Sequence, residues 1–336
     1  MDSPVVGRVP LVEVVRAGRV ECVHYGCVAV CDADGNVLDA LGHPELPTYL
    51  RSSAKPFQAA TIVQLGAADR WNLTDAELAL CCASHGAQPF HLEIVRSILA
   101  KCGFTPDDLL CGPHPPLHGP SAEALACSGQ KPDRIHNNCS GKHAGMLAAC
   151  RHKNWPAATY LEANHPLQQA NLQTMAAFAG MDAAAIPLGV DGCGVPTFYL
   201  PLARIATAFA RLANPDACPA PFDQWARRVV NAMARHPLHV AFDGELGAHL
   251  LQHLGEHVTG KGGAEGVFGV GLVGRGIGIA CKISDGAHRA LPALLVAMLE
   301  RFARDLNLDP FRRDALKPVK NTRGEVVGEL RAVMNA

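Results

Sequence analysis

The chain has 336 residues, of which 49% are hydrophobic and 18% are charged, a composition typical of a globular protein that buries a large core. Its formal net charge is −1, and it contains no basic block and no basic stripe interleaved with aromatic residues, so we expect no nucleic-acid partner. No stretch approaches the roughly 20 apolar residues that a membrane span needs. The opening Met1-Asp2-Ser3-Pro4 lacks the apolar segment of a secretion signal, so we expect a cytoplasmic protein.

Thirteen cysteines are an unusually high and odd number for one chain. In a reducing compartment most thiols stay free and behave as small hydrophobic side chains. Cys22, Cys27, Cys31, Cys81 and Cys82 lie in strand-like or apolar runs, so we expect them to pack in the core.

The predicted elements begin with an N-terminal hairpin, in which residues 20–30 and 37–40 form strands joined by the turn Asp34-Gly35-Asn36. Apolar periodicity then predicts helices over residues 52–65, 75–83, 89–102, 144–150, 160–180, 197–213, 221–235 and 291–306. Glycine-alternating strands are expected over residues 266–273 and 276–283, and the proline-rich segment 111–120 is expected to be irregular. Helices flanking antiparallel hairpins indicate an α+β fold, with one catalytic domain over residues 1–336.

The segment Ser52-Ser53-Ala54-Lys55 has the S-x-x-K pattern at the start of a predicted helix. Residues three apart share a helix face, so the Lys55 amine can approach the Ser52 hydroxyl, whereas Ser53 points elsewhere. A serine hydroxyl needs a base within hydrogen-bond reach to act as a nucleophile. The pattern therefore makes Ser52 and Lys55 candidate catalytic residues, although a solvated helix start is the alternative interpretation.

Two further segments follow S-x-x-K in the order found in serine acyl-transfer enzymes of the penicillin-binding and β-lactamase type. Ser84 follows the apolar run 78–83 and corresponds to the second serine motif, while Lys261-Gly262-Gly263 corresponds to the third. The two glycines predict that the backbone passes close to a substrate, where a Cβ would interfere. Together the three segments, in this order, indicate a serine acyl-transfer enzyme and make Ser84 and Lys261 further candidate residues.

A second cluster of polar and ligand-type residues lies between apolar helices, at residues 136–145 and 191–196. Cys139 and Cys193, together with His143 or His136, offer ligands for zinc, although the spacing is not the C-x-x-C type. Tight turns with buried thiols are the alternative interpretation of both segments.

At these positions the sequence resembles the Rhizobium etli-type L-asparaginases, a bacterial family distinct from the asparaginases with a threonine nucleophile. The resemblance rests on five segments, of which the Asn-Cys-Ser-Gly-Lys-His run is the most specific: 51–58, 83–85, 136–145, 191–196 and 261–266. The N-terminal hairpin, with Gly18, Glu21, His24 and Gly26, is also similar. It implies a fold like those of the serine β-lactamases and serine-dependent glutaminases, a homodimer, and hydrolysis of L-asparagine to aspartate and ammonia.

The resemblance also implies roles for individual residues. Ser52, Lys55, Ser84 and Lys261 would form the Ser-Lys centre, with Ser52 as the expected nucleophile, neutral Lys55 as its base and Lys261 lowering the pKa of Lys55 by charge repulsion. Zinc would be held by Cys139, Lys142 and Cys193. Arg51, His85 and Asp191 would orient the charged groups of the substrate or position the lysines. The sequence departs from the family after Val240-Ala241, where Phe242 replaces the usual glycine, so we expect a remodelled segment 238–260.

Two other functions remain open at this point. A glutaminase or a β-lactam hydrolase shares the Ser-Lys chemistry, although the absence of an export signal disfavours the β-lactam version. A non-catalytic zinc-binding protein of the same fold is the alternative from a different class.

Overall fold

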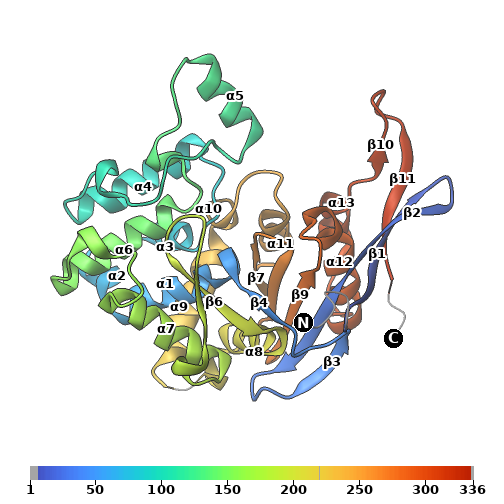
Figure 1. The fold of residues 1–336 in the computed structure, drawn as a ribbon, viewed down its shortest axis with the longest axis horizontal. Coiled ribbons are helices and arrows are strands. Elements are labelled where there is room, and N and C mark those ends of the chain that lie inside the picture. Colours follow the sequence, from blue (N-terminus) through green and yellow to red (C-terminus); the bar gives the residue numbers. More distant parts are fainter. Residues whose placement is uncertain (1–6, 219, 334–336) are drawn as a thin grey trace.

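The computed structural model describes residues 7–218 and 220–333, so the opening segment Met1-Asp2-Ser3-Pro4 lies outside the described residues. Its centre is an eight-stranded antiparallel sheet in the order β10-β11-β1-β2-β9-β8-β7, with β3 paired to β2 (Figure 1). A small second sheet has the order β4-β6-β5. The strands are β1 (Val9–Arg16), β2 (Arg19–Asp32), β3 (Val37–Leu41), β4 (Pro47–Tyr49), β5 (Leu188–Val190), β6 (Pro196–Pro201), β7 (Val258–Gly263), β8 (Val267–Leu272), β9 (Ile277–Ile283), β10 (Val319–Lys320) and β11 (Val326–Ala332).

Helices cover both faces of the large sheet, and most of the segment between β4 and β7 is helical (Figure 1). The α-helices are α1 (Lys55–Gln64), α2 (Ala67–Arg70), α3 (Asp75–Cys81), α4 (Pro89–Lys101), α5 (Gly119–Cys127), α6 (Ser140–Lys153), α7 (Pro166–Ala179), α8 (Leu202–Ala213), α9 (Phe222–Arg235), α10 (Pro237–Val240), α11 (Leu246–Leu254), α12 (Leu291–Phe302) and α13 (Asp309–Ala315). The short 3₁₀ helices are η1 (Arg51–Ala54), η2 (Pro106–Asp108), η3 (Arg134–His136), η4 (Ala157–Thr159), η5 (Ala183–Ala185), η6 (Pro215–Ala217) and η7 (His288–Ala290).

The two faces of the sheet carry side chains of different size, and each face packs against its own set of helices. Successive strand residues point to opposite faces, so Val28 and Val30 pack with α11, α12 and α13, whereas Cys27, Ala29 and Cys31 pack with the helical part. On that second face the sheet approaches α8 closely. A Cβ on Gly278 would lie 1.9 Å from the Ala206 carbonyl oxygen of α8, so only glycine fits there.

The α+β class and the antiparallel sheet flanked by helices are confirmed, as are the N-terminal hairpin and both glycine-alternating strands. The helix predicted over 197–213 is wrong at its start, because residues 196–201 pair as β6 with both β4 and β5. The helices predicted over 160–180 and 291–306 are shorter, at Pro166–Ala179 and Leu291–Phe302. All the cysteines are free thiols, and every one except Cys22 and Cys127 is buried. The expectation of a core position is wrong for Cys22, because the start of β2 is exposed or half-buried.

Across the described residues, none of the helices combines the length and apolarity that crossing a membrane would require.

Candidate active site

A cavity of about 650 Å³ lies where η1, the end of α3, β7 and the start of α12 meet. Ser52, Ser84 and Lys261, which are far apart in the sequence, all line it. Its volume is in the range of small-molecule binding sites. The structure thus brings three of the four predicted catalytic residues to one cavity wall.

The fourth residue, Lys55, lies directly behind this wall. The Nζ atoms of Lys55 and Lys261 are each 3.0 Å from the Ser84 Oγ, so one hydroxyl bridges two amines. Both lysines are buried, with 1% and 5% of their surface exposed. Lys55 also donates to the Ala83 carbonyl oxygen at 2.5 Å, and Lys261 donates to the Gly262 carbonyl oxygen at 2.8 Å. These bonds fix both amines beside Ser84.

The S-x-x-K segment is arranged differently from the sequence expectation. Ser52 lies in η1, and α1 begins only at Lys55, whose backbone N–H donates to the Ser52 carbonyl oxygen. Among the hydrogen bonds of the described residues, the Ser52 Oγ has none to either lysine. Ser53 is buried and its Oγ donates to the Lys261 carbonyl oxygen at 2.9 Å, so this neighbouring serine holds η1 against β7.

The protonation of the two amines is coupled by their closeness. Burial, followed by the positive charge of Lys55, lowers the pKa of Lys261 to about 8. The sequence argument placed this effect of charge repulsion on Lys55. In the structure, Lys261 is the amine that burial and its neighbour drive toward the neutral form.

The glycines after Lys261 serve the packing of the protein itself. A Cβ on Gly263 would lie 2.5 Å from the Leu50 carbonyl oxygen and 3.0 Å from the Ser53 Oγ. A Cβ on Gly262 would lie 3.1 Å from the Phe268 ring. Gly263 therefore permits a close approach between β7 and η1, and Gly262 one to Phe268 on β8. Both glycines also line the cavity, the side on which the sequence predicts a substrate.

Arg51 and Asp191, two of the expected substrate-binding residues, form an ion pair beside the cavity. The Arg51 Nε donates to the Asp191 Oδ1 at 2.7 Å, and the backbone of Arg51 has a left-handed φ of 50°. The Gly192 N–H also donates to the Asp191 Oδ1. Neither side chain lines the cavity, and together they tie η1 to the turn that contains Cys193.

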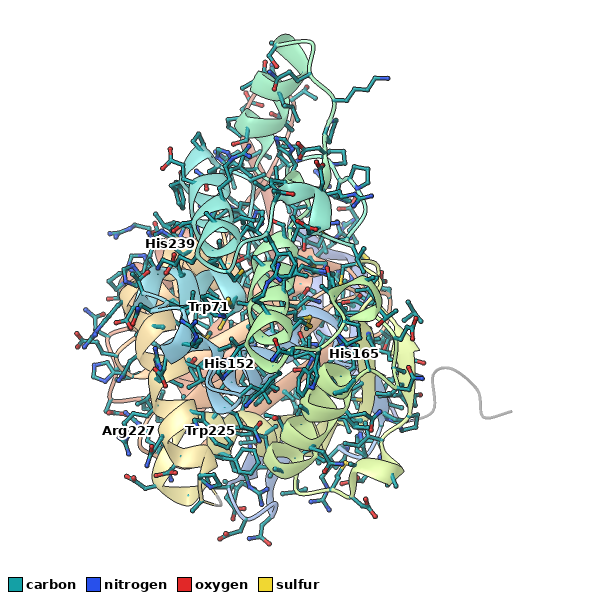
Figure 2. The ribbon with its side chains drawn as sticks, turned by 90° about the vertical axis from the view of Figure 1, so that its left-hand side faces the viewer. Trp71, His152, His165, Trp225, Arg227 and His239 are labelled. Atoms are coloured by element: carbon teal, nitrogen blue, oxygen red, sulfur yellow. The ribbon has the colours of Figure 1, made fainter. Side chains whose placement is uncertain are left out.

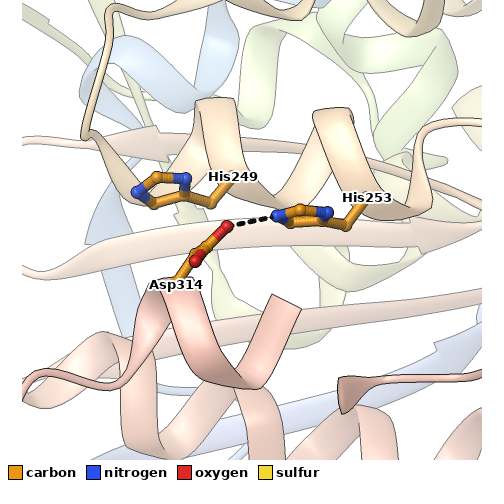
Figure 3. A group of neighbouring side chains, drawn as sticks. All are labelled: His249, His253 and Asp314. Carbon is orange, nitrogen blue, oxygen red and sulfur yellow. Dashed lines mark hydrogen bonds and ion pairs between the residues drawn. The ribbon is translucent and has the colours of Figure 1, made fainter. Parts of the chain in front are cut away.

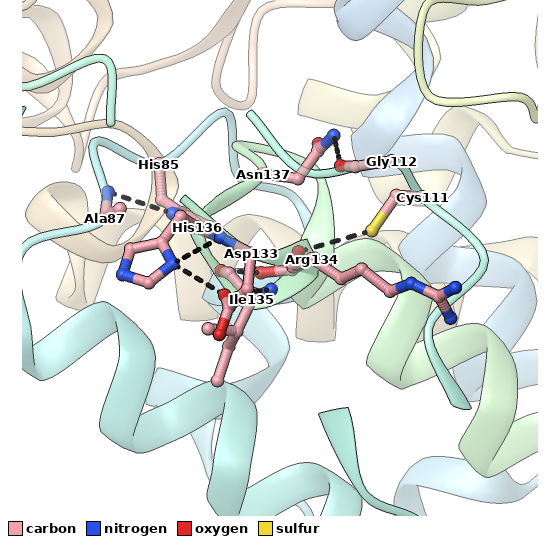
Figure 4. Close-up of polar contacts among 10 residues, drawn as sticks. His85, Ala87, Cys111, Gly112, Asp133, Arg134, Ile135, His136 and Asn137 are labelled. Carbon is pink, nitrogen blue, oxygen red and sulfur yellow. Dashed lines mark hydrogen bonds and ion pairs between the residues drawn. The ribbon is translucent and has the colours of Figure 1, made fainter. Parts of the chain in front are cut away.

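His85, the third expected substrate-binding residue, is fully buried, and both of its ring nitrogens are engaged. The Ala87 N–H donates to Nδ1, so Nε2 carries the proton and donates to the Ser140 Oγ at 2.8 Å (Figure 4). Burial and the neighbouring His91 hold the pKa of His85 well below its usual value. His85 is therefore neutral, does not line the cavity, and positions the start of α6.

Several residues that line the cavity were missed by the sequence argument, notably Glu245 and Arg289. The Arg289 Nε donates to the His24 Nε2 at 3.0 Å, and the His24 Nδ1 is 2.7 Å from the Asp285 Oδ2. This chain joins the N-terminal hairpin to the turn after β9. The only sequence signal was His24 itself, which is part of the family resemblance.

Phe242 also lines the cavity, in the segment where the sequence departs from the family. The segment forms α10 and α11, and the Val240 carbonyl oxygen accepts a hydrogen bond from the Ser84 N–H at 3.1 Å. A Cβ on Gly86 would lie 2.7 Å from the Phe242 Cβ. Phe242 is thus packed directly over the Ser84-His85-Gly86 segment.

The expected metal ligands form a compact buried cluster at the start of α6. The Lys142 Nζ donates to the Cys193 Sγ at 3.0 Å, and the Cys139 Sγ donates to the Asn138 Oδ1 at 3.2 Å. The neighbouring Cys139, then the charge of Lys142 and His143, lower the pKa of Cys193, so the cluster favours a thiolate there.

Two histidines were alternatives as ligands, and the structure separates them. The His136 Nδ1 is 2.6 Å from the Asp133 Oδ1 in a local cap at η3, and the neighbouring Asn137 binds the Gly112 carbonyl oxygen (Figure 4). The His143 Nδ1 is 2.7 Å from the Tyr160 hydroxyl oxygen, while its Nε2 is buried without a hydrogen-bond partner among the described residues. Two thiols and an amine are sulfur and nitrogen donors of the kinds that zinc takes, so the residues at the start of α6 fit the ion in their chemistry.

Solved structures similar to this chain include Mglu in its native form and a Bacillus glutaminase. The Mglu match has 15% identity and a TM-score of 0.46, and covers 84% of this chain and 65% of the Mglu chain. The Bacillus glutaminase match has 13% identity and a TM-score of 0.37, and covers 83% of this chain and 91% of that chain. The chain therefore spans about two thirds of the length of the Mglu chain.

Comparison with curated proteins gives no significant match. The sequence profile of the L-asparaginase II family matches residues 12–332, which include every residue of the cavity and of the thiol cluster. The chain belongs to the L-asparaginase II family.

Proposed function

We propose that the protein is an L-asparaginase that hydrolyses L-asparagine to L-aspartate and ammonia through a serine ester. Family membership supports an amidohydrolase. The observation that carries the mechanism is the Ser84 hydroxyl, 3.0 Å from two buried lysine amines on the wall of a cavity. A hydroxyl next to a neutral amine is the arrangement that activates a serine without a histidine.

The hydrogen bonds support a direction for the proton. Lys261, with its lowered pKa, is the base that accepts the serine proton, and Lys55 donates to the same oxygen. The serine oxygen bonds to the side-chain amide carbon, the carbon–nitrogen bond breaks, and the departing ammonia takes the proton from Lys261. Water then attacks the ester with Lys261 again as base, which releases aspartate and restores the serine.

Ser84 and Ser52 are both candidates for the oxygen that carries the acyl group. The hydrogen bonds favour Ser84, because its Oγ contacts both amines. Ser52, the nucleophile expected from sequence, faces the same cavity. Hydrogen bonds of catalytic groups often tighten only when substrate is present, so Ser52 remains the alternative.

The cavity wall offers one positive and one negative side chain that can pair with the charged groups of an amino-acid substrate. Arg289, held by His24 and Asp285, matches the α-carboxylate, and Glu245 matches the α-ammonium. The Arg51–Asp191 pair, which lies off the wall, supports η1 instead.

We also propose that Cys139, Lys142 and Cys193 hold Zn²⁺. Bound there, the ion would supply positive charge near the cavity and displace the proton of Lys142. Asn138, the residue before Cys139, lines the cavity. Zinc bound to Cys139 would therefore hold this part of the cavity wall in place. The family resemblance further suggests a homodimer, which light scattering of the purified protein tests.

The test is ammonia release from L-asparagine and L-glutamine by the wild type and by Ser84→Ala and Ser52→Ala. We expect turnover of asparagine, and a loss of at least about a thousandfold when the acylated serine is removed. Ser128→Ala is the matched control, because its exposed hydroxyl bonds only the Leu125 carbonyl oxygen. Mass spectrometry of acid-quenched enzyme then identifies the peptide that carries the acyl group.

Each other outcome points to a different function. Faster turnover of glutamine would keep the chemistry and change the substrate, and hydrolysis of nitrocefin would favour the β-lactam alternative. A folded protein that binds zinc but releases no ammonia from either amide would favour the non-catalytic alternative.

A further inference from the structure

Two histidines and an aspartate meet on the sheet face opposite α8, away from the candidate active site. His249 and His253 lie four residues apart on α11, and Asp314 lies on α13 (Figure 3). One ligand atom of each lies within 4.8 Å of the others. The two imidazole rings are stacked with an interplanar angle of 18°, and the Asp314 carboxylate lies between them (Figure 3).

The hydrogen bonding of this cluster is incomplete. The His253 Nε2 is 2.7 Å from the Asp314 Oδ2, but the His249 Nε2 is buried and has no partner among the described residues. A buried ring nitrogen without a partner is unfavourable, because it has lost its hydrogen bond to water.

We propose that His249, His253 and Asp314 form a site for a first-row divalent transition-metal ion such as Zn²⁺. Two imidazole nitrogens and one carboxylate oxygen are ligands that such ions prefer, and histidines four apart on a helix face the same side. His253 and Asp314 are partly exposed, at 23% and 36%, so water can complete the coordination. Arg313, with its Nε 3.7 Å from the Asp314 Oδ1, and Lys317 are the nearby positive charges that oppose the ion.

The ion would join two helices that belong to different parts of the chain. Asp314 lies in the C-terminal helix α13, whereas α11 begins at Leu246, a residue that lines the active-site cavity. α11 also packs on β7, which contains Lys261. The site therefore ties the helix at one end of the cavity to the C-terminal helices.

The test uses tag-free, metal-stripped full-length protein titrated with Zn²⁺ and Co²⁺. We expect the wild type to bind one equivalent more than His249→Ala or His253→Ala, and Zn²⁺ to raise the Tm of the wild type more than that of either variant. His257→Ala is the matched control, because His257 is exposed and outside the cluster. With Co²⁺, the additional equivalent should lack the intense charge-transfer absorption of thiolate ligation, which separates it from the Cys139–Cys193 cluster.

Asp314→Asn provides a second variant that keeps the shape of the side chain and removes its charge. Equal metal stoichiometry in the wild type, His249→Ala, His253→Ala and Asp314→Asn would overturn the proposal. So would an additional Co²⁺ equivalent that shows thiolate absorption and survives in all three variants.

Discussion

Lys261 is the residue whose surroundings most restrict the proposed chemistry. It is buried on β7, its amine contacts Ser84, and Lys55 approaches the same hydroxyl from α1. Two amines that share one hydroxyl cannot both be charged without repulsion. Burial and this repulsion explain why one of them becomes a base near neutral pH.

The lowered pKa predicts the pH dependence of turnover. If neutral Lys261 accepts the serine proton, kcat/KM should rise with pH up to a pKa of about 8 and fall about tenfold per pH unit below it. Lys261→Arg, whose guanidinium stays charged, should lose about 100-fold or more in rate and lack this limb. A wild-type profile that is flat between pH 6 and pH 9 would contradict the role of Lys261 as base.

Single residues could be predicted from sequence where they belong to a dense motif. Ser84 and Lys261 belong to motifs in a recognisable order, and both line the cavity. Arg289 could not be predicted in this way, because its side chain is held at the cavity by a hydrogen bond to His24, which is 265 positions away in the sequence. Such long-range contacts leave no local pattern.

Among the elements, the contact between η1 and β7 sets the geometry of the cavity wall. Ser52 belongs to η1 and Lys261 to β7, and the Ser53 Oγ joins them through the Lys261 carbonyl oxygen. Gly263 lets the two backbones meet at this point.

Gly263→Ala should therefore reduce activity without a change in any catalytic side chain. The added Cβ would meet the Leu50 carbonyl oxygen, which accepts the Ser53 N–H, and so would push η1 away from β7. A displacement of about 1 Å can cost about 100-fold in rate, so we expect a loss of this order in kcat/KM. Gly119→Ala is the control, because a Cβ there meets nothing within 4 Å. Equal kcat/KM values for the two folded variants would show that this contact does not position the catalytic groups.

Most elements could be predicted from local patterns, and the errors have a common physical cause. The segment 197–201 is apolar and continues into a true helix, so periodicity alone cannot separate a short buried strand from a helical turn. Its strand character comes from pairing with β4 and β5 on both sides. β1 and β11, which pair with each other, were not predicted either.

At the scale of the whole molecule, the sheet unites both ends of the described chain. β2 from the N-terminal hairpin pairs with β9, and β1 pairs with β11. Two hydrophobic cores lie on opposite faces of this sheet, and β2 contributes residues to both. The order of the strands was beyond sequence analysis, because pairing between distant segments depends on the packing of both cores. The shared sheet supports the expectation of one catalytic domain.

Cooperative unfolding tests that expectation. All three tryptophans, Trp71, Trp155 and Trp225, pack against the core on the α8 face, and Figure 2 shows Trp71 and Trp225 in the helical part. Leu294 on α12 is fully buried in the other core, so Leu294→Ala should cost about 2–5 kcal/mol. If the chain unfolds as one unit, tryptophan fluorescence should report this loss as a lower urea midpoint that coincides with the midpoint from circular dichroism.

The control is Leu38→Ala, because Leu38 is 50% exposed on β3 and its truncation should leave the midpoint nearly unchanged. A tryptophan midpoint that stays at the wild-type value in Leu294→Ala, while circular dichroism shows an earlier transition, would mean that the two cores unfold independently. The sheet would then separate two cooperative units, and the Ser84–Lys261 contact, which joins the end of α3 to β7, would lie at their boundary.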